Sequence, residues 1–335
     1  MTVAVIGAGL AGLACATALH KAGIEVDVYE ASDGVGGRVR TDLVDGFILD
    51  RGFQVTLTAY PEMQRQLDMD ALDLQAFDPG ALVWRHGKGS VVSDPFRMPT
   101  SLLGTVTAPI GSLFDKARIG LLRRRVRSVH PAQLLRGDDI STGDALREAG
   151  FSDKIIERFF RPLVGGIQLD PDLNDSRRMF DIIFRMLADG DSAVPAAGMQ
   201  AIPDQLAAQL PDGSIHLDQR VSATTATSIT IDGSTQVHDA VVVAAEGPAA
   251  AQLLGLATVA SKSVGCVYFA ADTPPTNKKL VVLDGTGVGP VLNVAVMSNV
   301  APTYAPKGRH LIAAAIPGVL PDGDLADIAR RQLRG

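Results

Sequence analysis

The chain has 335 residues, of which 46% are hydrophobic and 20% charged, and its formal net charge is −6. This composition is typical of a folded globular protein and excludes an intrinsically disordered one. The acidic balance argues against a nucleic-acid-binding protein, which would carry a basic excess. The two cysteines, Cys15 and Cys266, are too few for a disulfide framework or a cysteine metal site and favour a reducing compartment.

The chain shows no signal for export or for membrane insertion. Its start, MTVAVIGAG, has neither a basic segment nor a cleavage site. No uninterrupted apolar run reaches the ~18–20 residues of a spanning helix. The nearest candidate, residues 240–260, is divided by Glu246, Gly247 and Pro248. We therefore expect a cytoplasmic protein, with two or three structural units because single cores stop growing near ~250–300 residues.

The first thirty residues predict a strand, a helix and a second strand. Residues 2–7 are a short apolar strand, TVAVIG, and residues 24–30 are another, IEVDVYE. Between them lies a segment with helical spacing, whose predicted buried face carries Leu10, Leu13, Ala14 and Ala18. The three elements form a βαβ unit, whose crossover is right-handed.

The loop between the first strand and the helix has the pattern G-x-G-x-x-G. Gly7 is suited to the tight turn, Gly9 to close approach of a pyrophosphate, and Gly12 to close packing of helix against strand. The helix N-terminus adds unpaired N–H groups and a partial positive charge. Glu30 ends the second strand where an acid meets ribose hydroxyls, which disfavours the 2′-phosphate of NADP. These residues leave NAD and FAD open.

A second glycine cluster, ASDGVGGRVRT at residues 31–41, favours FAD over NAD. An NAD site needs no further glycines after the acid. Gly36 and Gly37 would let the backbone approach the longer flavin side of FAD. Arg38 would either bring a fixed charge to the pyrophosphate, because the planar guanidinium matches phosphate oxygens, or hold the flavin end of the cleft. The alternative is a flexible turn with a solvated arginine.

The rest of the chain alternates between a nucleotide-binding unit and a second unit. Residues 94–195 have mostly helical patterns, residues 199–210 predict a helix, and residues 239–245, DAVVVAA, predict a buried parallel strand. We expect four segments: a first part of the FAD-binding domain, a mostly helical substrate or cap region, a return segment of the FAD-binding domain, and a substrate-domain sheet with a terminal helix, at residues 1–93, 94–195, 196–255 and 256–335.

The segment VAVIGAGLAGLACATALHKAGIEVDVYEASDGVGGRVRT resembles the start of the FAD-dependent amine oxidase-like superfamily. That group includes monoamine oxidases, protoporphyrinogen oxidases and phytoene desaturases, and later segments resemble the desaturase and protoporphyrinogen oxidase branch. The resemblance implies an α/β fold with a Rossmann-like FAD-binding domain (GR2 type), interleaved with an α+β substrate domain that contains a helical insertion.

The resemblance also implies which residues hold FAD. The family places an Asp and a Gly near the flavin, here Asp50 and Gly52 in GFILDRGFQV, and a backbone group on the adenine, here at Val221. With the two glycine loops, the predicted cofactor-binding residues are Gly7, Gly9, Leu10, Ala11, Gly12, Glu30, Ala31, Gly36, Gly37, Arg38, Gly52 and Val221.

One family element has no match in the 335 residues. Near their C-termini, family members carry a Gly-Asp pair and a glycine-containing helix start that closes over the flavin. The late candidate here, Gly323 and Asp324, lacks the small glycine-containing turn, so an N-capping Asp322 or Asp324 is the better interpretation. We therefore expect the C-terminal FAD motif to be missing from this sequence.

The family chemistry is removal of a hydride equivalent from a C–C or C–N bond to flavin N5. It needs no dedicated nucleophile, and the histidines show no metal-ligand spacing, so the sequence predicts no metal and no identifiable catalytic residue. Some relatives use a lysine near the flavin, but no match is convincing among Lys262, Lys278 and Lys279. The alternative function is a non-catalytic flavin-binding or flavin-free protein of the same fold; an NAD-dependent dehydrogenase is disfavoured by the second glycine cluster.

The helical region indicates a partner and a substrate class. Residues 118–127 combine apolar side chains with five arginines, from Arg118 to Arg127, and a basic amphipathic helix can lie on an anionic membrane surface. The alternative is a solvated face paired with nearby acids. Only 16 residues are aromatic, which favours an aliphatic pocket for an apolar substrate over an aromatic cage for a small amine. The sequence gives no indication of the oligomeric state.

Overall fold

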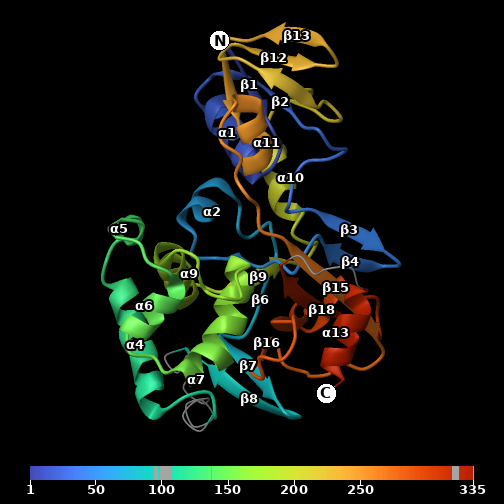
Figure 1. The fold of residues 1–335 in the computed structure, drawn as a ribbon. Coiled ribbons are helices and arrows are strands. Elements are labelled where there is room, and N and C mark those ends of the chain that lie inside the picture. Colours follow the sequence, from blue (N-terminus) through green and yellow to red (C-terminus); the bar gives the residue numbers. More distant parts are fainter. Residues whose placement is uncertain (94–96, 99–107, 137, 319–323, 335) are drawn as a thin grey trace.

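The computed structural model describes residues 1–93, 97–98, 108–136, 138–318 and 324–334. A parallel sheet with its helices lies at one end of the molecule, and a larger mixed sheet with a helical region lies at the other (Figure 1). The chain passes between the two ends several times, as the colours along the ribbon show. The fold is a mixed α/β fold in which the two units are interleaved along the sequence.

The parallel sheet has the strand order β10-β2-β1-β14. Its strands are β1 (Thr2–Ile6), β2 (Glu25–Tyr29), β10 (Ile215–His216) and β14 (Ala240–Val243). Val3 and Val5 face helices α1 (Leu10–Lys21) and α10 (Ala201–Ala207), while Ala4 and Ile6 face the opposite side, because side chains alternate along a strand. The opposite side is covered by a three-stranded meander, made of β11 (Val221–Thr224), β12 (Ser228–Ile231) and β13 (Ser234–Val237), and helix α11 (Gly247–Leu254) contacts β11.

The mixed sheet has the order β15-β18-β17-β16-β7-β8 and is antiparallel except between β16 and β7. Its strands are β7 (Gly80–Arg85), β8 (Lys88–Ser93), β15 (Val264–Ala271), β16 (Val281–Asp284), β17 (Asn293–Val296) and β18 (His310–Pro317). One face packs against α13 (Leu325–Leu333). The other face packs against the start of α10 and against α12 (Met297–Val300) and the short helix η3 (Pro302–Tyr304).

The helical region covers the β7–β16 end of the mixed sheet. Its elements are α4 (Leu113–Arg127), α5 (Pro131–Leu134), α6 (Thr142–Glu148), α7 (Asp153–Ile155), η2 (Ile156–Gly165), α8 (Gly166–Gln168) and α9 (Arg177–Asp189). They share one core with the strand residues Ala81, Val83 and Leu283. The helical character expected for residues 94–195 is found in the described part of this range.

One helix differs in type from its sequence pattern. Residues 156–165 form a π-helix, and Pro162 lies inside it. Proline has no N–H to donate along a helix. The Pro162 carbonyl oxygen accepts a hydrogen bond from the Nδ2 amide of Asn293 on β17, at 3.2 Å. This contact ties the wide helical turn to the mixed sheet.

Short antiparallel strands lie between the two large sheets. β3 (Thr41–Val44) and β4 (Phe47–Asp50) form a hairpin, and β9 (Ser192–Pro195) pairs with both β5 (Thr56–Leu57) and β6 (Leu74–Ala76). Helix α2 (Pro61–Gln66) follows β5. The segments that leave the second glycine cluster therefore run directly into the junction between the large sheets (Figure 1).

Three local expectations differ from the structure. The buried face of α1 carries Gly12, Leu13, Ala16 and Thr17, because the helix packs with Gly12 against the Gly7 carbonyl, and Leu10 is exposed. Strand β14 is parallel as expected but only half-buried. Strands β7 and β8, within residues 1–93, belong to the mixed sheet. The four segment boundaries stay a prediction.

Two predictions about helices are confirmed. In α10 and the residues around it, the four apolar side chains predicted for one face are all buried: Met199, Ile202, Leu206 and Leu210. Asp324 caps α13, since its Oδ1 accepts hydrogen bonds from the N–H groups of Ala326 and Asp327. Asp322 lies outside the described residues. In the part of the chain that the structure describes, no helix has both the length and the apolar character needed to cross a membrane.

Candidate functional site

The first glycine loop joins β1 to α1 at the carboxyl edge of the parallel sheet. The Gly7 N–H donates to the Tyr29 carbonyl oxygen at 2.8 Å, which fixes the loop to β2. A Cβ atom on Gly12 would lie 1.8 Å from the Gly7 carbonyl oxygen, so Gly12 is required for packing. A Cβ atom on Gly9 would meet nothing within 4 Å. Gly9 therefore leaves an open backbone surface rather than filling a tight contact.

Helix α1 begins without a side-chain cap. Gly9 is its N-cap and has no side chain to accept a hydrogen bond from the first turn. The first N–H groups of a helix have no partner within the helix, and Leu10 and Ala11 are exposed here. The positive end of the helix is thus open to an anionic group such as a phosphate.

The second glycine loop lies directly against the first. The Gly36 N–H donates to the Ala8 carbonyl oxygen at 2.8 Å, and Gly9 and Gly36 form an isolated parallel bridge. Gly37 has a φ of +57°, and a Cβ atom there would lie 3.4 Å from the Gly9 Cα. The two glycine clusters therefore form one continuous backbone surface.

Three arginines follow the second glycine loop, and they differ in their partners. Arg40 pairs with Asp33 at 2.8 Å, and Arg51 pairs with Asp42 at 2.9 Å. Arg38 is exposed, and its guanidinium has no hydrogen-bond or ion-pair partner among the described residues. An unpaired arginine beside an uncapped helix N-terminus is suited to bind a pyrophosphate.

Glu30 links the first loop to the start of the second. Its Oε2 accepts a hydrogen bond from the Ala8 N–H at 2.8 Å, and its Oε1 accepts from the N–H and the hydroxyl of Ser32 at 2.9 and 2.8 Å. An ionised carboxylate offers about four acceptor positions. Glu30 is half-exposed, so one position remains for a ligand hydroxyl.

The predicted adenine-binding segment lies beside Glu30 although it is far away in sequence. The Gln219 N–H donates to the Glu30 carbonyl oxygen at 2.8 Å, and the Asp218 N–H donates to the Ser32 carbonyl oxygen at 3.0 Å. Ala31 lies between these two contacts. Val221 starts β11 and is buried against Ile6 and Tyr29. Its side chain is therefore in the core, which leaves its backbone as the part that can contact a ligand.

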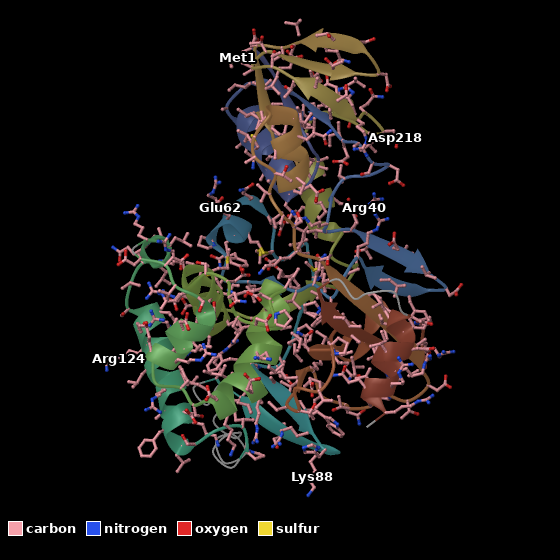
Figure 2. All side chains as sticks on the ribbon, viewed as in Figure 1. Met1, Arg40, Glu62, Lys88, Arg124 and Asp218 are labelled. Carbon is pink, nitrogen blue, oxygen red and sulfur yellow. The ribbon has the colours of Figure 1, made fainter. Side chains whose placement is uncertain are left out.

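Gly52 lies in a loop that contacts the second glycine loop. The Gln54 side-chain amide donates to the Arg38 carbonyl oxygen at 2.7 Å, and the Arg51 N–H donates to the Arg40 carbonyl oxygen at 2.8 Å. Gly52 has a φ of +117°, which few other residues adopt. The structure thus brings the predicted cofactor-binding residues together through direct backbone and side-chain contacts. Figure 2 places Arg40 near the junction of the two large sheets.

Asp50 is the buried centre of this junction. Its Oδ1 accepts from the Thr41 hydroxyl at 2.6 Å and from the Met199 N–H at 2.8 Å, and its Oδ2 accepts from the Tyr304 hydroxyl at 2.8 Å. Burial raises the pKa of Asp50 above its usual range, and these hydrogen bonds partly offset the increase. Its carboxyl group is enclosed by protein groups, so Asp50 supports the site and does not face a ligand.

Two tyrosines at this junction were not predicted from the sequence. Tyr304 contacts the Asp50 carboxylate, and the Tyr268 hydroxyl lies 2.8 Å from the Asp50 carbonyl oxygen and 3.1 Å from that of Gly52. The two tyrosines are separated from Asp50 by 254 and 218 residues. No local pattern marks them, because the contact depends on how the mixed sheet meets the hairpin β3–β4.

Lys262, one of the three lysines considered from the sequence, is held in ion pairs. Lys262 forms ion pairs with Asp170, at 3.7 Å, and with Asp175. These contacts bind the segment that crosses between the two sheets to the loop after the π-helix. Among the described residues, no cluster of histidine, cysteine, aspartate or glutamate is arranged to hold a metal ion.

The match to known proteins extends over almost the whole chain. Residues 10–335 match the family model described as flavin containing amine oxidoreductase. The chain belongs to this family. The amine oxidase-like membership that the two glycine loops predicted is therefore confirmed, and so is FAD as the family's cofactor.

Two curated relatives have names that refer to carotenoid and porphyrinogen enzymes. The chain is 27% identical to the carotenoid phi-ring synthase of Streptomyces griseus, covering 99% of this chain and 72% of the relative. It is 26% identical to the chloroplastic/mitochondrial protoporphyrinogen oxidase 2 of Arabidopsis thaliana, covering 65% of this chain and 49% of the relative. The chain thus spans about half the length of the plant enzyme.

Solved structures show the same fold. An oxidoreductase from Methanosarcina mazei superimposes with a TM-score of 0.72 at 22% identity, covering all of this chain and 82% of the other. A putrescine oxidase with bound putrescine superimposes with a TM-score of 0.67 at 19% identity, covering 95% and 76% of the two chains. The expected α/β fold with a Rossmann-like FAD-binding unit is confirmed.

The residues of this chain fit FAD. The open surface at Gly9, the uncapped start of α1 and the unpaired Arg38 are all at the contact of the two glycine loops. They supply backbone N–H groups and a cation, which are the groups that bind a pyrophosphate. Glu30 lies at one end of this surface and the Gly52 loop at the other, which suits an elongated dinucleotide.

Proposed function

We propose that the protein is an FAD-dependent oxidoreductase that removes a hydride equivalent from a C–C or C–N bond of an apolar or amine substrate. FAD, when bound, supplies the two-electron acceptor at flavin N5. The chain's own residues orient it: α1 and Arg38 bind the pyrophosphate, Glu30 a ribose hydroxyl, and the Gly52 loop the flavin end. The observation that carries the proposal is the contact between the two glycine loops beside the unpaired Arg38.

The positions of the aromatic side chains support an apolar substrate rather than a small amine. Five phenylalanines pack on one another within the helical core, mostly edge to face: Phe151, Phe159, Phe160, Phe180 and Phe184. Tyr268 and Tyr304 bind the Asp50 region. These aromatic residues are therefore not available for a cage around a small amine. The names of the carotenoid and porphyrinogen relatives support the same class of substrate.

Spectroscopy of the purified chain tests the cofactor and the reaction separately. We expect a yellow protein with a flavin absorbance spectrum, or apoprotein that regains this spectrum when FAD is added. Anaerobic addition of porphyrinogen, carotenoid or amine substrates should then bleach the flavin bands for one class. A chain that neither retains FAD nor takes it up contradicts the proposed function.

The second candidate function is a flavin-binding protein of the same fold without turnover. The observation that favours it is the pairing of Lys262, whose ammonium group forms ion pairs with Asp170 and Asp175. A holoprotein whose flavin is reduced by dithionite but by none of the substrate classes would support this candidate.

We also propose that helix α4 contacts an anionic membrane surface. Three large apolar side chains on α4 are mostly exposed: Leu113 (64%), Phe114 (76%) and Leu121 (65%). Residues 114 and 121 are seven apart and so share one face of the helix. Arg124 lies on the outer side of α4 (Figure 2), next to a hollow of about 340 Å³ that Arg123 and Arg127 also line.

The remaining arginines of α4 fit the alternative of a solvated, paired face. Arg125 pairs with Asp181 at 2.5 Å, and Arg127 pairs with Asp189 at 2.7 Å. Arg118 lies 3.9 Å from Asp115. The membrane proposal therefore depends on the apolar side chains and Arg124 rather than on all five arginines.

Vesicle sedimentation tests this contact. Wild-type protein should sediment with phosphatidylglycerol vesicles and less with phosphatidylcholine vesicles. The double substitution Leu113→Ser and Phe114→Ser should weaken binding on the order of tenfold, because it removes two inserted apolar groups. The control is Val237→Ser on β13, which is 80% exposed in the meander. Equal binding of the double variant and the control would contradict the proposal.

A further inference from the structure

The junction between the two large sheets contains a tyrosine whose hydroxyl is directed at the backbone of the predicted flavin loop. Tyr268 lies on β15 of the mixed sheet, and its hydroxyl is 2.8 Å from the Asp50 carbonyl oxygen and 3.1 Å from the Gly52 carbonyl oxygen. One hydroxyl has one proton, so the two carbonyls share it. Burial, with the nearby Cys266 and Asp50, raises the pKa of Tyr268 far above its usual range. The hydroxyl is therefore a permanent donor.

The backbone that Tyr268 holds has an unusual conformation. The Gly52 N–H donates to the Asp50 carbonyl oxygen at 2.7 Å, which closes a tight turn around Arg51. Gly52 follows with a φ of +117° and is half-exposed. A turn of this kind in an exposed loop is held by few local contacts. The Tyr268 hydroxyl supplies a contact from the opposite unit of the fold.

The same loop is attached to the cofactor site on its other side. The Gln54 amide donates to the Arg38 carbonyl oxygen at 2.7 Å. The loop 50–54 is therefore linked to the backbone of Arg38, two residues after Gly36, which forms the bridge with Gly9. Tyr268, the loop and the second glycine loop form one chain of contacts.

Tyr304 provides a comparison within the same junction. Its hydroxyl donates to the Asp50 carboxylate at 2.8 Å and, among the described residues, makes no hydrogen bond with the loop backbone. The carboxylate is also held by Thr41 and by the Met199 N–H. Tyr304 thus anchors a side chain that has other donors, whereas Tyr268 anchors the backbone itself.

We propose that Tyr268 is a positioning residue of the FAD site, whose hydroxyl fixes the backbone of Asp50 and Gly52 and thereby places the loop 50–54 for the flavin end of the cofactor. The inference rests on the proposed FAD site. It assigns the mixed sheet a direct part in shaping a cofactor site whose other residues come from the parallel-sheet unit. Without the hydroxyl, both carbonyls lose a donor and the loop samples other conformations before FAD binds.

The test compares Tyr268→Phe with Tyr304→Phe in the full chain. Each substitution removes one hydrogen-bonded hydroxyl and keeps the ring, so the side-chain change is the same at both positions. FAD affinity is measured by titrating apoprotein and following flavin absorbance, and the free energy of unfolding of each apoprotein is measured in urea. We expect Tyr268→Phe to raise the Kd for FAD about three- to tenfold, the effect of one net hydrogen bond, and to shift the flavin bands. Tyr304→Phe should change the Kd less than about twofold.

A second variant, Gln54→Ala, keeps the inference testable if Tyr268→Phe does not fold. Gln54→Ala removes the link between the same loop and Arg38 at a half-exposed position, and it should raise the Kd in the same direction. If the Kd and the spectrum are unchanged in both Tyr268→Phe and Gln54→Ala, the role of Tyr268 is overturned but the proposed FAD site is not. Equal increases for Tyr268→Phe and Tyr304→Phe overturn it in favour of general stability. A wild-type chain that binds no FAD overturns the proposed cofactor site as well.

Discussion

Helices α1 and α4 begin in opposite ways, and the difference favours the start of α1 as the proposed ligand site. Helix α4 has a complete capping box: the Ser112 hydroxyl accepts from the Asp115 N–H at 3.0 Å, and the Asp115 carboxylate accepts from the Ser112 N–H at 2.7 Å. Helix α1 begins at Gly9, which has no side chain to cap it. Helix α4 thus satisfies the N–H groups of its own first turn, whereas helix α1 leaves them for a partner.

The charges around the two helices differ in the same way. Near α4, Arg125 and Arg127 pair with Asp181 and Asp189. Near α1, Arg38 has no partner in the described part of the chain, although the neighbouring Arg40 has one. Exposed donors that have no protein partner are hydrated, and a ligand can replace that water. The comparison therefore points to the start of α1 as the anion-binding site.

The largest expected effects are on the unfolding free energy and on FAD binding, and they distinguish the packed Gly12 from the open Gly9 in the loop before α1. Gly12→Ala places a Cβ atom 1.8 Å from the Gly7 carbonyl oxygen and should cost on the order of 3 kcal/mol or more of unfolding free energy, measured by urea denaturation of the apoprotein. Gly9→Ala should cost less than about 1 kcal/mol, since it weakens only the N-cap, yet it should abolish FAD binding. Equal destabilisation by both changes would contradict the comparison.

The next largest effect is expected from a substitution in the second glycine loop, on the FAD content of the protein. Gly37→Val places a β-branched side chain at a φ of +57° and against Gly9, so FAD content should fall below about a tenth of wild type. Gly233→Val in the turn between β12 and β13, with a φ of +78° and open space around it, is the control for backbone strain. A fully loaded, non-covalent Gly37→Val holoprotein would contradict the predicted approach to FAD.

The two neighbouring arginines provide a smaller, sharper comparison. Arg38→Ala should weaken FAD binding about ten- to a hundredfold, the effect of losing charge-assisted hydrogen bonds to a phosphate. Arg40→Ala removes the ion pair with Asp33 and some packing beside Gly36 but no group predicted to hold the phosphate, and it should change the Kd by less than about threefold. Isothermal titration with FAD at fixed ionic strength measures both. Similar losses for the two variants would show that Arg38 has no specific role.

The smallest effect concerns the capped helix. Burial opposes ionisation of Asp115, but hydrogen bonds from the N–H and hydroxyl groups of Ser152 and Ser112 outweigh it and lower the pKa to about 2. Because the folded pKa lies below the ordinary value of 3.8, this stabilisation is present above pH 3.8 and is lost as the pH falls through about 2. Asp115→Asn should cost about 2 kcal/mol at pH 7.

Urea denaturation from pH 7 to pH 3 measures this effect. The difference between wild type and Asp115→Asn should shrink as the pH falls. The control is Asp144→Asn at the start of α6, because the Asp144 carboxylate accepts from the Ser141 hydroxyl at the matching position but its side chain is 62% exposed. A difference that stays constant with pH would show that the Asp115 charge contributes nothing to stability.

Features that depend on neighbours in the chain were predictable from the sequence. The βαβ unit follows from apolar runs and glycine spacing, and the start of α13 follows from the capping preference of Asp324. Membership of the flavin family followed from the two glycine loops, because their spacing is set by local turns.

The sequence could not predict contacts whose partners lie far apart in the chain. The bonds from Tyr268 and Tyr304 to residue 50 span more than 200 residues, and the neutralisation of Lys262 depends on a loop near residue 170. The π-helix at residues 156–165 likewise has a tertiary contact, the Asn293 amide on the Pro162 carbonyl.

The sequence by itself thus determined the family and its cofactor class, and it predicted which residues would hold the cofactor, since glycines and an acid at fixed spacing shape a nucleotide site through local geometry. Only the tertiary structure decided which charges stay free and which are neutralised. Arg38 and Arg40 read alike in the sequence, but folding places Asp33 on Arg40 and leaves Arg38 open. Pairing is decided by where side chains meet in space, and the fold alone brings them there.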